Sequence, residues 1–387
     1  MKTLPASLLL LAGACAAVCA GDVFPAGAEP AASVPLALAQ LVSNALAGNP
    51  GLVAAHTRWE AMAEKPAQAG APANPMLTFR GMDQADGGDF PNSNEKRYEI
   101  EQPLTAFGKG ALRRQAAAAE AQAMKSEYES MALDVVLEIK EACYGLWSAR
   151  KAQAILRAET NVLARLGAVA QTAFVAGQAG QPEVIMAQAE VTMLAPRLLA
   201  LDAQVRALES KLNVLMGRAP DEPLQIAAPP LPEESDKAVE FYRGLAEKSR
   251  PEIRQAAAVL ERARIERRLM GREALPDYRV GLEYRTYRNE EPDMAMFMVG
   301  IELPVWRGKV RAGIREADRM VASGQAALEA ARQQAGLDAQ QAYFNAKAAH
   351  ETLNLYRDTL IPQAQARFEA SEAGYRADRM DFMNLLE

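Results

Sequence analysis

Three methionines with alternate spacing, Met294, Met296 and Met298, are the residues best placed to do chemistry. Alternate residues of a strand share a face, so these thioethers would lie opposite the face that carries Phe297 and Val299. Thioethers suit soft ions such as Cu(I). The simpler interpretation is that methionine only fills space in a strand, and both interpretations stay open at this point.

A second polar group lies near the end of the chain and comprises Tyr375, Arg376, Asp378, Arg379 and Asp381. Acids and bases at this spacing can form ion pairs and hydrogen bonds. Ion pairs that lose contact with water can stabilise a structure more than scattered surface ion pairs, which contribute ~0.2 to 1 kcal/mol each. The alternative is an ordinary solvated helix turn.

Catalytic and metal-binding sets are not found. The chain has two histidines, His56 and His350, and Cys143 is the one cysteine beyond the predicted leader. We therefore expect no metal site, no cofactor and no enzyme, for want of a convergent acid, base or metal set. The net charge of -6 has both signs interspersed, which makes nucleic acid an unsuitable partner.

The N-terminus predicts export. Residues 1–20 combine Lys2, a short apolar core and small residues before a cleavage point after Ala20, which is typical of a signal peptide. Cys15 resembles the lipidated cysteine of a lipoprotein box only weakly, so lipid attachment there is the minor alternative. Residues 21–33 are rich in Ala, Pro and Gly and predict a flexible N-terminal segment. No later segment reaches the ~20 continuous apolar residues of a membrane-spanning helix.

One helix is expected to be very long. The stretch from Phe107 to Ala176 has no proline, and a helix over it would span ~105 Å. Apolar or small residues recur four and three apart, which predicts a seam against a partner helix. The seam is Tyr128, Ala132, Val135, Ile139, Ala142, Leu146, Ala149, Gln153, Leu156, Thr160, Leu163, Gly167, Ala170 and Phe174. One arm of a soluble coiled coil would show the same pattern.

The chain also contains a tandem repeat. Pro50, Pro75 and Pro103 recur 201 positions later as Pro251, Pro276 and Pro304, and Gly108-Lys109 recurs as Gly308-Lys309. We expect a first repeat at 34–218, a Pro-rich linker at 219–235 and a second repeat at 236–387, which stops before its last helix. In the first repeat, Pro50 is expected to begin a helix that runs to about Ala69. Two strands should follow it.

The pattern of the strands predicts a sheet that spans a membrane. Residues 277–286 and 294–303 alternate between apolar and polar side chains, and each has the length of a strand that crosses the hydrocarbon layer. Because every strand edge in a membrane must be paired, four strands per chain imply that several chains share one barrel. A soluble four-stranded sheet packed on helices is the alternative.

Several motifs carry a resemblance to a known family. They are Asn49-Pro50, Ala73-Asn74-Pro75, Gln102-Pro103, Phe107-Gly108-Lys109 with Arg113-Arg114, Leu360-Ile361-Pro362-Gln363-Ala364 and Gly374-Tyr375-Arg376-Ala377-Asp378. Together they resemble the outer-membrane efflux protein (TolC) family, most closely its heavy-metal efflux (CzcC/CusC-like) branch. The resemblance implies a mainly α fold with a transmembrane β part, in which tandem-duplicated long helical hairpins form a periplasmic tunnel. Four β-strands per protomer would join a trimeric 12-stranded barrel.

The resemblance also implies a setting. It places a homotrimer in the outer membrane of a Gram-negative bacterium, in contact with lipid, a periplasmic adaptor (membrane fusion) protein and an inner-membrane RND-type pump. The expected function is export of metal ions or drugs without catalysis. From a different class, a soluble periplasmic coiled-coil adaptor or scaffold would share the leader and the helical seam, but would not need the strands.

By the same resemblance, the polar group near the end of the chain marks a channel gate at the periplasmic tip. Its candidates are Tyr375, Arg376, Asp378, Arg379, Asp381 and Asn384 in the second repeat, and Phe174 and Glu183 in the first. The family usually has glycine where Asp378 stands and an acid where Asn384 stands, which puts part of the gate charge in doubt. Pro362 is expected to act as a hinge or as a static bend.

Overall fold

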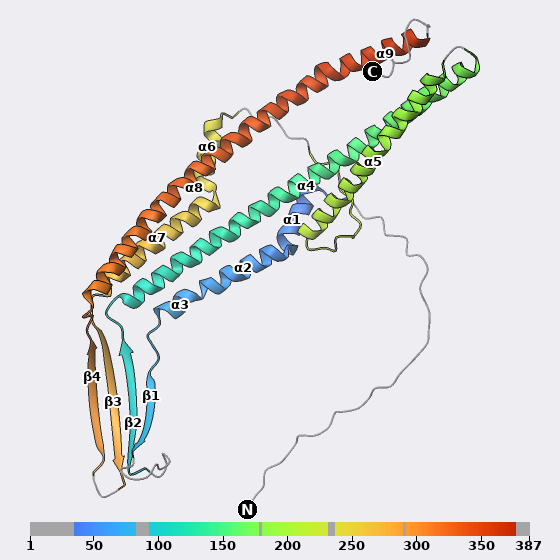
Figure 1. Ribbon diagram of the computed structural model, residues 1–387. Helices are drawn as coiled ribbons and strands as arrows, with labels where there is room; N and C mark the ends of the chain where they lie inside the picture. The colour runs from blue at the N-terminus through green and yellow to red at the C-terminus, as the bar shows by residue number, and fades with distance from the viewer. Residues whose placement is uncertain (1–34, 83–92, 178–179, 231–236, 289–291, 377–387) are drawn as a thin grey trace, which may run out of the picture.

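The computed structural model describes residues 35–82, 93–177, 180–230, 237–288 and 292–376. These residues form an elongated molecule, with the strands at one end and long helical arms extending from them (Figure 1). Several predictions fall outside the described residues: the signal peptide, the segment 21–33, Cys15, Asp378, Arg379, Asp381 and Asn384.

The first half of the chain builds short helices, two strands and a helical hairpin. Its elements are α1 (Leu38–Gly48), α2 (Pro50–Ala63), α3 (Lys65–Gly70), β1 (Met76–Met82), β2 (Glu95–Leu104), α4 (Lys109–Val175) and α5 (Gln181–Leu215). With 67 residues, α4 is ~100 Å long. A helix of this length is longer than a compact domain is wide, so α4 is the central helix of an extended helical arm.

The second half repeats this order as far as its long helix. It contains α6 (Val239–Ser249), α7 (Pro251–Arg272), β3 (Asp277–Tyr287), β4 (Met294–Glu302), α8 (Arg307–Leu355), the π-helical turn η2 (Tyr356–Leu360) and α9 (Ile361–Arg376). In Figure 1, α7 lies beside α8 much as α2 and α3 lie beside α4. The predicted fold class, long duplicated helices with four strands, is thus confirmed.

The prediction of a single helix from Pro50 to about Ala69 is wrong in one detail. The structure divides it into α2 and α3 at Glu64, because Pro66 stands at the start of α3 and has no backbone N–H to donate. The equivalent helix α7 has Arg267 at this place and runs unbroken for 22 residues.

The predicted seam of α4 is confirmed by its burial. Ile139 and Leu146 are fully buried, and Phe174 is the one seam residue in the exposed class. The seam packs against α5, and Leu41 of α1 and Leu212 of α5 complete the core there. The spacing of three and four along α4 therefore marks the packing of a helical hairpin within one chain. Helix α1 packs against this hairpin.

Helix α5 bears on the expectation about later apolar segments, although it contains no run of ~20 continuous apolar residues. Among the described helices it is the one that is long and apolar enough to cross a membrane, judged by length and composition. However, it lies along α4 and forms polar links with it. Gln153 donates a hydrogen bond to Asp202, and Arg150 pairs with Glu209 at 2.6 Å. We therefore assign α5 to the helical arm.

Candidate conduction pathway

The four strands form one antiparallel sheet in the order β1-β2-β3-β4. Residues directly opposite each other share a face, and Ile100 lies opposite Leu77 on one side and Leu282 on the other. This face is apolar and open: Phe297 is 71% exposed. A large uncovered apolar face on a sheet with transmembrane strand lengths is suited to lipid.

The opposite face is charged. Arg97 Nε lies 2.7 Å from Glu95, and Arg285 pairs with Glu283, a carboxylate that is only 7% exposed. Ion pairs of this kind, side by side on one face, resemble the polar interior of a membrane barrel.

The structure places the three methionines on this charged face. Met294 lies opposite Arg285, Met296 opposite Glu283 and Met298 opposite Gly281. The side chain of Met298 lies over Gly281, since a Cβ added to that glycine would be 3.4 Å from the methionine Cε. The thioethers therefore stand beside charged groups and away from the apolar face.

Both outer strands of the sheet are unpaired along one edge in the described chain. β1 pairs only with β2, and β4 pairs only with β3. An edge with free N–H and C=O groups cannot lie in lipid without a partner strand. The protomer is therefore only part of the barrel.

A buried lysine joins the sheet to the helices. Lys109 is 1% exposed, and its Nζ lies 3.0 Å from Asp277 Oδ2 and 3.5 Å from Glu273. The same Asp277 accepts a hydrogen bond from the Ala106 N–H at 2.6 Å. This cluster links the start of α4 to the start of β3.

The turn before α4 needs glycine. Gly108 has φ +83°, and a Cβ there would collide with the guanidinium of Arg272. That guanidinium donates a hydrogen bond to the Phe107 carbonyl at 2.6 Å. Sequence reasoning found the Gly108-Lys109 turn but missed its partners, because they lie in the other repeat and no local pattern marks them.

Two exposed aromatic side chains lie at the level where the sheet ends and the helices begin. Phe107 is 92% exposed and Trp306 is 78% exposed. Aromatic rings at the end of transmembrane strands are typical of the boundary between lipid and water.

The structure brings the tips of the two repeats together. Tyr375 of α9 packs against the buried group formed by Ala170, Val184 and Ala187 at the end of the α4 and α5 hairpin. Nearby, Glu183 lies in the first turn of α5 and accepts a hydrogen bond from the Gly180 N–H at 3.5 Å. Of the other gate candidates, Phe174 is exposed in the last turn of α4, and Arg376 is the last residue of α9.

Pro362 lies just after the π-helical turn η2. Proline cannot donate the backbone hydrogen bond to the residue four before it, and its ring crowds that carbonyl. A π turn at this point widens the helix and accommodates both effects. The first repeat has its own helical proline, Pro196 inside α5, which sequence reasoning missed.

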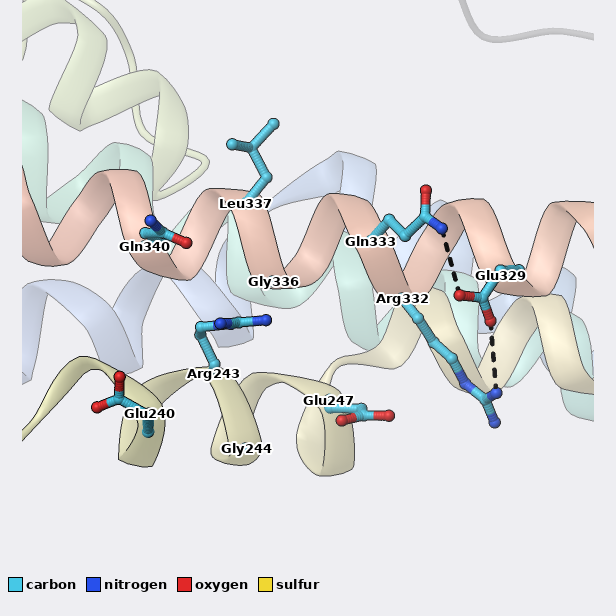
Figure 2. Close-up of a pocket in the computed structure, with 10 residues that line it drawn as sticks. All are labelled: Glu240, Arg243, Gly244, Glu247, Glu329, Arg332, Gln333, Gly336, Leu337 and Gln340. Carbon is cyan, nitrogen blue, oxygen red and sulfur yellow. Dashed lines mark hydrogen bonds and ion pairs between the residues drawn. The ribbon is translucent and has the colours of Figure 1, made fainter.

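A shallow groove of about 660 Å³ lies between α6 and α8 (Figure 2). Its lining mixes both signs: Glu240, Arg243, Gly244, Glu247, Glu329, Arg332, Gln333, Gly336, Leu337 and Gln340. Glu329 accepts a hydrogen bond from Gln333 at 3.3 Å and pairs with Arg332 at 3.8 Å. Across the described part of the chain, no group of three or more His, Cys, Asp or Glu side chains could hold a metal ion.

A two-faced sheet with open edges, continued by long helical hairpins, defines a membrane-barrel channel with a helical extension. The Outer membrane efflux protein family matches residues 41–218 and 243–377, which is most of the sequence. The chain belongs to the outer membrane efflux protein family. A search among curated proteins gives no match.

Solved structures show the same fold. The outer-membrane channel OprN is 21% identical over 90% of this chain and 82% of that chain, with a TM-score of 0.73. CusC is 15% identical over 91% and 85%, with a TM-score of 0.77. VceC of Vibrio cholerae is 17% identical over 90% and 88%, with a TM-score of 0.73.

Family membership makes this chain an outer-membrane efflux channel whose helices form the periplasmic part. It confirms the family, the function and the location that the sequence predicted. The family and these similar proteins are channels rather than enzymes. The alternative of a soluble periplasmic scaffold is set aside, because this family forms channels in the outer membrane.

Proposed function

We propose that three copies of this chain form one channel, which receives its substrate from a periplasmic adaptor and an inner-membrane RND-type pump. The open edges of β1 and β4 beside an uncovered apolar face carry this proposal, because both need partners that a single copy does not supply. Members of the family are trimeric channels that work with such adaptors and pumps, which supports the same assembly.

The periplasmic entrance of this channel closes at the tips. In the proposal, Tyr375 and Arg376 act with Phe174 and Glu183, and the acidic and basic residues from Asp378 to Asp381 add ion pairs around the threefold axis. The contact of Tyr375 with Ala170 and Val184 supports this role, since it couples the two tips of one protomer. A gate built in this way would open only when both tips move.

The proposed substrates are metal ions, with drugs as the alternative. Support comes from Met294, Met296 and Met298, which lie on the charged face that would line the barrel. Thioethers interact weakly with hard ions and more strongly with Cu(I). Weak, repeated contacts suit a conduit, because an ion must enter easily and also leave.

The proposal is tested with the full chain purified from outer membranes. The mass of the detergent complex should be that of three protein copies, and planar bilayers should show discrete conductance steps. A deletion strain should lose tolerance to copper or silver and keep its tolerance to ethidium. A monomeric mass without conductance would overturn the assembly, whereas lost ethidium tolerance with normal copper tolerance would reassign the substrate.

A further inference from the structure

The two β-hairpins of the sheet repeat each other residue by residue. Met76 lies opposite Glu101 in the first hairpin, and Asp277 lies opposite Glu302 in the second, with both members 201 positions further on. Met82 opposite Glu95 is matched in the same way by Glu283 opposite Met296. The offset found among the prolines therefore holds within the strands.

The junction between the hairpins has its own register. Glu101 lies opposite Gly281 and Glu99 opposite Glu283, where β2 meets β3. A barrel closes with even strand tilt when successive junctions stagger by the same amount. The junction between two protomers, where β4 meets β1 of the next copy, is the repeat equivalent of the junction between β2 and β3.

We propose that β4 pairs with β1 of a second copy in this repeated register, which sets Glu302 opposite Arg80 of the neighbouring protomer. This inference rests on the trimer proposed above. The shift by 201 carries the pair Glu101 and Gly281 onto Glu302 and Arg80, and the pair Glu99 and Glu283 onto Gly300 and Met82.

The charges support this register. Within one copy, Arg80 lies opposite Arg97 and Glu302 lies opposite Asp277, so each stands beside a like charge. Arg97 and Asp277 have their own partners in Glu95 and Lys109. Neither Arg80 nor Glu302 forms an ion pair within the described residues, and both are exposed. Opposite charges directly across a strand pair stabilise it.

The apolar side chains also fit the proposed register of β4 with β1 of the next copy. The same register sets Leu303, which directly follows β4 and is 64% exposed, opposite Phe79 of the next copy, which is 54% exposed. A slip by one residue would turn Arg80 to the apolar face, because successive side chains point to opposite faces. A slip by two would keep the faces but move Arg80 opposite Gly300 or Pro304, which offer it no charge.

Charge reversal provides the first test. Arg80→Glu and Glu302→Arg should each lower the temperature at which the purified trimer dissociates on semi-native gels. The double variant should recover most of the loss, because it restores an opposite pair. A double variant less stable than both single variants would overturn the register. Arg285→Glu is not a suitable control, because Arg285 already pairs within the protomer.

Disulfide trapping provides the second test and does not depend on stability. Gly300→Cys with Met82→Cys should give a covalent trimer on oxidation with diamide, faster than Met298→Cys with Met82→Cys, which are opposite only after a slip by two. The native Cys143 is buried, so the protein without the introduced cysteines gives the background level of cross-linking. Faster trapping of the slipped pair would overturn the register and keep the trimer. A wild-type protein with the mass of one copy would overturn both.

Discussion

Lys109 Nζ lies 3.0 Å from Asp277 Oδ2, and these two residues are separated by 168 positions in the sequence. One begins the long helix of the first repeat, and the other begins a strand of the second. The contact fixes the helical arm of one repeat to the barrel strand of the other. The repeats are therefore interlocked at the level where the sheet ends and the helices begin.

Replacing Lys109 tests how much this contact stabilises the fold. Lys109→Met removes the cation that lies 3.0 Å from Asp277, whereas Glu273 keeps Arg113 at 3.8 Å. Removal of one partner from a fully buried pair costs about 3 to 5 kcal/mol, and we expect the lower end, since Asp277 is 33% exposed. The unfolding temperature, followed by circular dichroism, should fall clearly.

The matched control for this change is Lys309→Met. Lys309 is the repeat equivalent of Lys109 but is exposed. Its replacement should shift the unfolding temperature little. Equal shifts for the two variants would show that burial of Lys109 contributes nothing of its own.

The gate is tested at the end of the chain. Asp378→Ala combined with Asp381→Ala should raise single-channel conductance in planar bilayers by about twofold or more, because charged rings narrow and bias a pore entrance. The control is Asp358→Ala, an exposed carboxylate on η2 that pairs with Arg357 at 2.8 Å. Conductance unchanged by the double replacement would remove these residues from the gate.

Pro362 is tested as a hinge. Pro362→Ala restores a backbone donor, so the π turn at Tyr356–Leu360 can revert to α-helix and the proposed hinge is lost. We expect fewer spontaneous openings per minute in bilayer recordings. Pro196→Ala, at the helical proline of α5, is the control and should leave openings unchanged. The same opening frequency in the Pro362 variant and wild type would mean a static bend.

The methionines are tested by replacement of all three with leucine. Leucine conserves volume, so the barrel should assemble normally. The triple variant Met294→Leu, Met296→Leu, Met298→Leu should reduce tolerance to copper and silver and leave zinc tolerance unchanged. Met193→Leu, at an exposed position of α5, controls for methionine loss as such. Wild-type copper tolerance in the triple variant would leave these side chains a space-filling role.

Cys143 should be inert in the folded channel. Burial raises the pKa of its thiol above the ordinary value of 9.0, so less thiolate forms at any given pH. Its neutral form contributes stability that is complete below pH 9.0 and is lost as the pH rises through the folded pKa. A maleimide at pH 7.5 should label the protein only after denaturation. Rapid labelling of the folded channel would contradict the burial of this thiol.

Much of the fold was predictable because its signals are local. The seam of α4 follows a spacing of three and four, and Ile139 and Leu146 prove to be buried where it places them. The strands show their two faces by simple alternation, and Phe297 lies on the exposed apolar face as expected. The break at Pro66 was missed although its signal is equally local, because proline removes a helix donor wherever it stands.

The sequence by itself determined the elements, their duplication and the two faces of the sheet, since periodicity and backbone chemistry act within a few residues. It could not decide which of two equivalent lysines is buried. Gly108-Lys109 and Gly308-Lys309 look alike in the sequence, yet Lys109 is enclosed by Asp277 and Glu273 while Lys309 is exposed. The difference belongs to the tertiary structure, because the carboxylates that enclose Lys109 come from the distant second repeat, which packs over the first.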